Sequence, residues 1–110
     1  TKDGTGVRDY IHVNDLAAAH VRAMDHLVEQ DQDVVVNLAT GEGHSVLDVI
    51  YKAEEVSMRK INYRVVGRRA GDPDTVLAGS KKAFDILKWE PQHSDLETLI
   101  QSTWQVYKHE

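Results

Sequence analysis

The chain has 110 residues, enough for one domain with a buried core and hardly for two. Thirteen Lys and Arg against 18 Asp and Glu give a formal net charge of −5, which argues against general binding to nucleic acid or anionic membranes. The absence of cysteine excludes disulfide scaffolds, thiolate zinc sites and thiol nucleophiles. No apolar run could span a membrane, and no signal-peptide pattern is present. Because the sequence begins with Thr1 rather than Met, we expect it to be a fragment of a longer protein.

The first part of the chain predicts an extended segment, a helix and a buried strand. Residues 7–13 alternate in character, as short strands do. Apolar residues then recur at helical spacing over 13–30, and His12 or Asn14 could start this helix. Residues 34–39 form an apolar run without alternation, which is typical of a strand covered on both faces of a parallel sheet.

The middle of the chain predicts a second helix and a second strand. After a glycine turn at 40–44, Ser45 and Asp48 form a capping-box-like helix start. Residues 61–66 alternate between apolar and polar up to Val65 and predict a strand. Residues 67–74 contain two glycines and a proline, which predict a loop.

The last part of the chain predicts a short strand and two helices. The strand is expected at 75–78, and Ser80 is placed to cap the first helix. Ser94 and Glu97 form a capping box for the last helix. This order of strands and helices predicts an α/β fold. Few predicted strands remain to flank the buried one, so we expect part of the sheet to lie in sequence beyond this chain.

Two glycine pairs carry the first half of a dinucleotide-binding fingerprint. Gly4-Thr5-Gly6 and Gly41-Glu42-Gly43 both lack the third glycine, because Asp9 and Val46 stand in its place. The second pair lies between a predicted strand and a predicted helix. Its backbone N–H groups either hold a phosphate or belong to an ordinary tight turn.

The six histidines lack the spacing of metal ligands, so no metal site is predicted. His20 lies on the apolar face of the first helix, and we expect it to be buried and hydrogen bonded. No serine nucleophile motif is present either.

A basic stretch interrupts this acidic chain. No acidic residue occurs between Val56 and Gly71, but five cations do: Arg59, Lys60, Arg64, Arg68 and Arg69. Guanidinium groups bind phosphate oxygens in pairs, and a carboxylate can bind sugar hydroxyls, so Arg69 and Asp72 on one loop fit a nucleotide. The alternative is a surface arginine pair with Asp72 capping a turn.

Arg8 lies in an apolar and aromatic segment, where a charged group needs a partner. That partner is either a bound ligand or a carboxylate of the chain, Asp9 or Asp15.

Several motifs occur in order along the chain: DGTGVRDYIHV at 3–13, DLA at 15–17, NLATG at 37–41, RRAGDP at 68–73, SKKA at 80–83 and LKWEP at 87–91. In this order and spacing they resemble the UDP-glucose 4-epimerases of the extended short-chain dehydrogenase/reductase family, over essentially the whole chain. The resemblance implies that residues 1–110 are the C-terminal UDP-sugar-binding fragment of a Rossmann-type enzyme whose N-terminal NAD-binding domain is absent. The strand at 34–39 and the helix before it would pack against that domain.

The resemblance also implies an activity. The parent protein would interconvert UDP-glucose and UDP-galactose in galactose metabolism, by NAD-dependent oxidation and reduction at C4. In the family a tyrosine removes the 4-hydroxyl proton while hydride passes to NAD, which the absent domain would bind. The full-length enzyme would be a cytoplasmic homodimer without nucleic-acid or membrane partners.

The substrate-binding positions that the resemblance carries over are Arg8, Arg69, Ala70, Gly71, Asp72 and Val76. Arg8 and Arg69 would bind the diphosphate, and Asp72 the uridine ribose. Val76 stands where some members have a tyrosine beside the substrate sugar, so that contact is lost.

The catalytic Tyr-x-x-x-Lys pair of the family is absent, because Asn14, Glu55 and Gly67 follow Tyr10, Tyr51 and Tyr63 at that spacing. We therefore predict no catalytic or cofactor-binding residue here and expect the chain to be inactive alone. Strand edges and apolar faces left open would favour self-association. Two alternatives remain: another nucleotide-sugar epimerase or dehydratase, or a non-enzymatic nucleotide-binding or interaction module.

Overall fold

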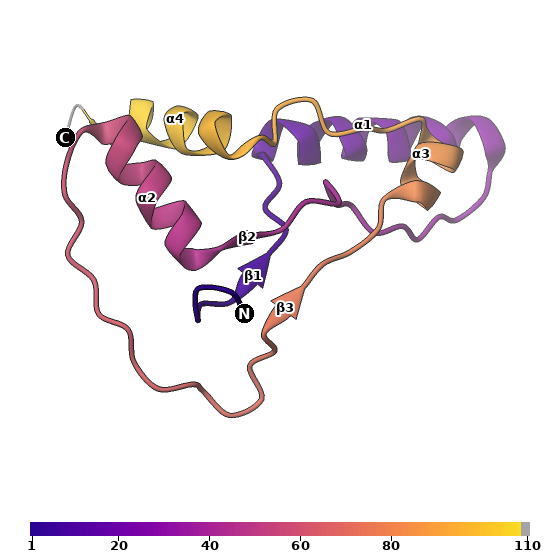
Figure 1. Cartoon of the computed structure of the whole chain (residues 1–110). Coiled ribbons are helices and arrows are strands. Elements are labelled where there is room, and N and C mark those ends of the chain that lie inside the picture. The colour runs from indigo at the N-terminus through magenta and orange to yellow at the C-terminus, as the bar shows by residue number, and fades with distance from the viewer. Residues whose placement is uncertain (109–110) are drawn as a thin grey trace.

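The computed structural model describes residues 1–108, which form small strands and helices around a thin core (Figure 1). The elements in chain order are β1 (Val7–Arg8), α1 (Val13–Gln30), β2 (His44–Ser45), α2 (Val46–Ser57), β3 (Thr75–Val76), α3 (Lys81–Leu87) and α4 (Leu96–Tyr107). The predicted α/β class is confirmed, and the first predicted helix has the bounds of α1.

The strand β1 is the centre of a small sheet with the order β2-β1-β3. It runs antiparallel to β2 and parallel to β3, so that Arg8 lies opposite His44 on one side and Val76 on the other. Gly43 permits this close approach, because a Cβ there would lie 2.6 Å from Val7 Cγ1 and 2.8 Å from a methyl group of Leu77.

The start of α2 is tied to the N-terminal turn. The predicted capping box is confirmed, since Asp48 N–H donates to Ser45 Oγ and Ser45 N–H donates to Asp48 Oδ2, each at 3.0 Å. Ser45 Oγ donates in turn to Asp3 Oδ2 at 2.5 Å, and Leu47 N–H donates to Thr5 Oγ1 at 3.2 Å. The hydroxyl of Ser45 is the main reason that the pKa of Asp3 lies below its ordinary value. These bonds hold α2 beside β1.

Asp15, in the first turn of α1, is buried and fully hydrogen bonded. Its side chain accepts from the N–H groups of Gln92 and His93 at 2.9 Å and from Ser94 Oγ at 2.5 Å. Its carbonyl oxygen accepts from Trp89 Nε1 at 2.8 Å. Asp15 is only 2% exposed and Trp89 only 1%. The chain after α3 is thereby fastened to the beginning of α1.

The pKa of Asp15 reflects this arrangement. Burial raises the pKa, but the hydrogen bonds from Ser94, Gln92 and His93 together outweigh burial and keep it below the ordinary value of 3.8. The carboxylate therefore contributes stability above pH 3.8, and this contribution is lost as the pH falls through the lower folded-state pKa.

His12 caps α1, one of the two starts predicted. Its Nδ1 accepts from Asn14 N–H at 3.0 Å, while its Nε2 lies 2.9 Å from Ser102 Oγ on α4. The backbone N–H of His12 donates to Ser94 Oγ at 2.9 Å. The same residue therefore starts α1 and holds α4 against it.

Of the other two predicted caps, the one at Ser94 is wrong and the one at Ser80 is confirmed in position only. Ser94 does not cap α4 with Glu97, because its hydroxyl is used inside the hydrogen-bond network of Asp15; Asp95 caps the helix instead by accepting from Thr98 N–H at 3.0 Å. Ser80 occupies the capping position of α3 but makes no side-chain hydrogen bond there.

The two longer predicted strands do not form. Within the described chain, residues 34–39 and 61–66 have no strand partner. Val36 and Leu38 pack against the core, whereas Val35 is 79% exposed, so residues 34–38 are covered on one side only, and Ala39 at the end of the segment is buried. A strand needs a hydrogen-bonded neighbour, and β1, β2 and β3 pair only with one another. Packing of 34–39 on an NAD-binding domain stays a prediction.

His20 is also placed differently from the prediction. It is exposed rather than buried, although its Nδ1 lies 2.7 Å from the carbonyl oxygen of Leu16. The core that α1 shares with α3 is small and consists of Ala19, Ala83, Leu87 and Trp89. His20 is not among the residues of this core.

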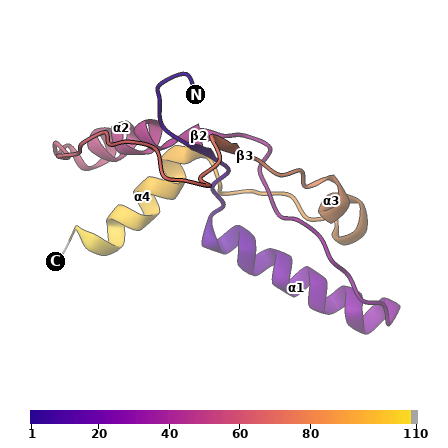
Figure 2. The same ribbon diagram turned by 90° about the horizontal axis from the view of Figure 1, so that it is seen from below.

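The chain is less compact than most domains of its length. Its radius of gyration is 16.7 Å, compared with about 13 Å expected for this number of residues. The connection from α2 to β3 swings out opposite α1 and α4 in Figure 1, and α1 projects away from the sheet in Figure 2. Large apolar side chains on α1 are exposed by 61–79%: Val13, Val21, Met24 and Val28.

Replacing Asp15 with alanine is expected to lower the free energy of unfolding by about 3 kcal/mol, because buried donors lose a charged acceptor. Urea unfolding followed by circular dichroism would measure the loss. Asp85→Ala is the control, since Asp85 forms only an exposed ion pair with Lys81 at 3.4 Å and should matter little. Equal losses in the two variants would contradict the role of Asp15.

We expect the chain to self-associate, because several large apolar side chains of α1 are exposed and such faces favour association in water. Size-exclusion chromatography with light scattering would show species heavier than the monomer, and Met24→Glu on α1 should reduce them. A clean monomer at high concentration would contradict this expectation.

Candidate functional site

The loop between the basic stretch and β3 folds back over β1. Asp74 O accepts from Val7 N–H at 2.8 Å, which aligns β3 with β1. Gly71 has a φ of 78°, a conformation that glycine adopts without strain, and Asp72 N–H closes the turn on Arg69 O at 3.3 Å. The turn presents the side chains of Arg69 and Asp72 beside β1.

Asp72 holds two arginines at once. Its Oδ1 accepts from Arg8 Nη2 and its Oδ2 from Arg69 Nη2, both at 3.1 Å. Arg8 also donates to the carbonyl oxygens of Pro73 and Val7, at 3.1 and 2.8 Å. These bonds fix the guanidinium of Arg8 at the end of β1, while Arg69 is held by Asp72 alone among the described contacts.

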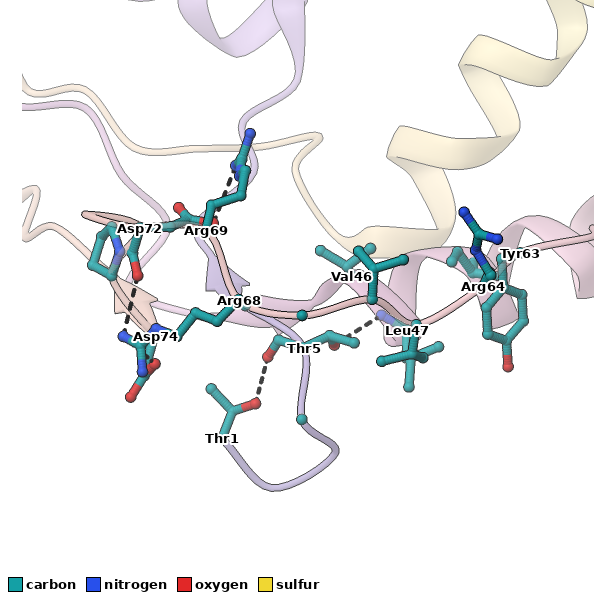
Figure 3. Close-up of a pocket in the computed structure, with 17 residues that line it drawn as sticks. Thr1, Thr5, Val46, Leu47, Tyr63, Arg64, Arg68, Arg69, Asp72 and Asp74 are labelled. Atoms are coloured by element: carbon teal, nitrogen blue, oxygen red, sulfur yellow. Dashed lines mark hydrogen bonds and ion pairs between the residues drawn. The ribbon is translucent and has the colours of Figure 1, made fainter.

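A second ion pair lies beside the first. Arg68 Nη2 is 2.7 Å from Asp74 Oδ1 and also donates to Asp72 O at 3.1 Å. Figure 3 shows Arg69 turned toward Asp72 and Arg68 turned toward Asp74. The two neighbouring arginines therefore have different carboxylate partners.

The surrounding cations stabilise the charged form of Asp72. The hydrogen bond from Arg69 is the largest cause, and the charges of Arg69, Arg8 and Arg68 act in the same direction, so the pKa of Asp72 lies below its ordinary value despite some burial. The carboxylate is thus ionised at neutral pH.

Two hollows adjoin this cluster. One of about 490 Å³ lies between the turn at 4–6, the first turns of α2 and the segment 63–69 (Figure 3). The other, of about 600 Å³, is bordered by residues 68–73. Their walls bring the cationic side chains of Arg68 and Arg69 to the same region of the surface as the carboxylate of Asp72. Guanidinium groups are the side chains that bind phosphate oxygens in pairs.

The structure brings three of the predicted site residues into contact: Arg8, Arg69 and Asp72. Val76 lies opposite Arg8 across β1 and β3 and is 45% exposed. Residues 70–71 form the exposed turn between Arg69 and Asp72. The sequence did not assign Tyr63 and Arg64 to a site, although both line the first hollow. The signal that could have identified Arg64 is the basic stretch in which it lies.

The carboxylate partners suggested by sequence for Arg8 are wrong. Neither Asp9 nor Asp15 pairs with it. The side chain of Asp9 accepts from Thr40 N–H at 3.0 Å, Gly41 N–H at 2.9 Å and Thr40 Oγ1 at 2.7 Å. The glycine turn at 40–44 therefore closes on a carboxylate of the chain itself.

Among residues 1–108 no group of three or more His, Asp or Glu side chains is arranged to hold a metal ion. Over the same range, every helix is too short or too polar to cross a lipid bilayer.

The chain is similar in sequence to known proteins. Residues 1–39 match the model of the NAD dependent epimerase/dehydratase family. The UDP-glucose 4-epimerase of Rhizobium leguminosarum bv. trifolii is 49% identical over 104 residues, which are 94% of this chain and 32% of that protein. The UDP-glucose 4-epimerase of Lactobacillus helveticus is 41% identical over 98% of this chain and 33% of its own length. The chain thus spans about a third of the length of these relatives.

Solved structures give the same result. UDP-glucose-4-epimerase from Stenotrophomonas maltophila, with bound NAD and formylated UDP-arabinopyranose, is 42% identical and superposes with a TM-score of 0.92 over 99% of this chain and 32% of its own. The enzyme from Bifidobacterium longum, in complex with NAD+ and UDP, is 40% identical with a TM-score of 0.86 over the same shares. The chain is therefore a relative of the UDP-glucose 4-epimerases that shares their α/β fold over about a third of their length, which confirms the predicted resemblance.

Proposed function

We propose that residues 1–110 are the UDP-sugar-binding part of a UDP-glucose 4-epimerase, which interconverts UDP-glucose and UDP-galactose in galactose metabolism. The observation that carries this proposal is the convergence of Arg8, Arg69 and Asp72, which brings β1 and a loop 64 residues away into one cluster. The relatives support it, because the enzyme from Bifidobacterium longum was solved with NAD+ and UDP.

The two arginines suit the diphosphate of such a ligand. Arg8 and Arg69 meet at one carboxylate, so their guanidinium groups lie close enough to bind adjacent phosphate oxygens of a single ligand. The carboxylate of Asp72 then binds the ribose hydroxyls. Val76 lies next to Arg8 across the sheet and offers the sugar an apolar contact without a hydroxyl group.

The described residues do not fit the cofactor NAD. Neither glycine pair completes the dinucleotide fingerprint, and the N–H groups of Thr40 and Gly41 hold Asp9 rather than a phosphate. We place the NAD site, and the tyrosine base of the reaction, in an N-terminal domain of the parent protein. The parent is proposed to be a cytoplasmic homodimer, and the role of residues 1–110 is to bind and orient the UDP group.

Titration calorimetry with UDP tests the site. Arg69→Ala should weaken binding about tenfold to a hundredfold, because a charged hydrogen bond contributes about 1.5–3 kcal/mol. Lys60→Ala is the control, since it removes one positive charge from the same basic stretch at a residue that lines neither hollow. Equal affinity of the unchanged chain and Arg69→Ala for UDP would refute the assignment.

The purified 110-residue chain should show no turnover of UDP-galactose in a coupled assay with added NAD, because it lacks the tyrosine and lysine pair. A full-length UDP-glucose 4-epimerase under the same conditions is the positive control. Measurable turnover by the chain would show that these residues hold a complete active site.

A further inference from the structure

The place between Arg8 and Arg69 is taken by the carboxylate of Asp72. Each of its oxygens accepts from one guanidinium group at 3.1 Å. The side chains of Arg8, Asp72 and Arg69 are 29%, 34% and 83% exposed, so a ligand can reach the cluster from solvent. An incoming anion must therefore compete with a carboxylate that the chain itself provides.

The cost of this competition depends on what else the ligand carries. A bare anion that displaces Asp72 leaves the carboxylate without its cations and beside a second negative charge, which opposes binding. A ligand with sugar hydroxyls can donate hydrogen bonds to the displaced carboxylate and so offset the lost ion pairs.

We propose that Asp72 is a specificity-determining residue, which screens Arg8 and Arg69 from anions that lack a sugar and admits nucleoside diphosphates. This inference rests on the proposed function, because it takes the two arginines as the diphosphate site. Arg68 is not part of the competition, since it is held by Asp74 at 2.7 Å. The low pKa of Asp72 supports the proposal, because the carboxylate stays charged at neutral pH.

The test compares the affinities of the chain for inorganic diphosphate and for UDP at one fixed ionic strength. Asp72→Asn keeps the size of the side chain but removes its charge, so it should bind inorganic diphosphate about tenfold more tightly than the unchanged chain. The affinity for UDP should rise much less than this or fall. The ratio of the affinity for UDP to the affinity for inorganic diphosphate should therefore fall about tenfold. Asp72→Ser is a second neutral variant that should act in the same direction.

Asp74→Asn is the matched control. It removes the same charge two residues away, from a carboxylate that pairs with Arg68 instead of Arg8 and Arg69. It should leave the ratio of the two affinities unchanged. Thermal unfolding followed by circular dichroism shows that each variant compared is folded.

Two results would overturn the proposal: a preference for UDP that Asp72→Asn leaves unchanged, or an equal fall in this preference in Asp74→Asn. If the unchanged chain does not bind UDP, the proposed function fails by itself. In that case, a rise in the affinity for inorganic diphosphate that is confined to the two Asp72 variants still supports screening by Asp72. If this affinity does not rise in those variants, the screening proposal is overturned as well.

Discussion

The carboxylate of Asp15 is the interaction on which the arrangement of this chain depends. It satisfies the backbone N–H groups of Gln92 and His93 and the hydroxyl of Ser94, in a place with almost no solvent. Ser94 also accepts from His12, whose ring caps α1 and reaches α4. One buried charge therefore joins the start of α1 to a segment 77–79 residues further along the chain.

The candidate site depends on a second joint, the strand β1. Arg8 stands on β1, with β2 on one side and β3 on the other, and the absence of a side chain at Gly43 lets these strands approach. The loop that carries Asp72 reaches β1 because Asp74 O accepts from Val7 N–H immediately before β3 begins. The ion pairs of Asp72 are therefore a consequence of sheet pairing as well as of charge.

The sequence predicted the helices better than the strands, for a physical reason. A helix is stabilised by hydrogen bonds and apolar contacts within four residues, so its periodicity and caps are visible locally, as at α1 and at the Ser45 capping box. A strand exists only with a partner, and residues 34–39 and 61–66 find none in the described chain. The predicted cap at Ser94 is wrong for a similar reason, because its hydroxyl bonds instead to His12 and Asp15, which are distant in the sequence.

By itself, the sequence determined the α/β class, the bounds of α1, the resemblance to the epimerases and the kinds of residues at the site, because these follow from composition, periodicity and motif order. Only the tertiary structure decided which groups meet. Arg8 has a carboxylate next to it in sequence, yet it pairs with Asp72, while Asp9 binds the turn at Gly41. Alternate side chains of an extended segment face opposite ways, so chain neighbours such as Arg8 and Asp9 take different partners, and strand pairing decides which.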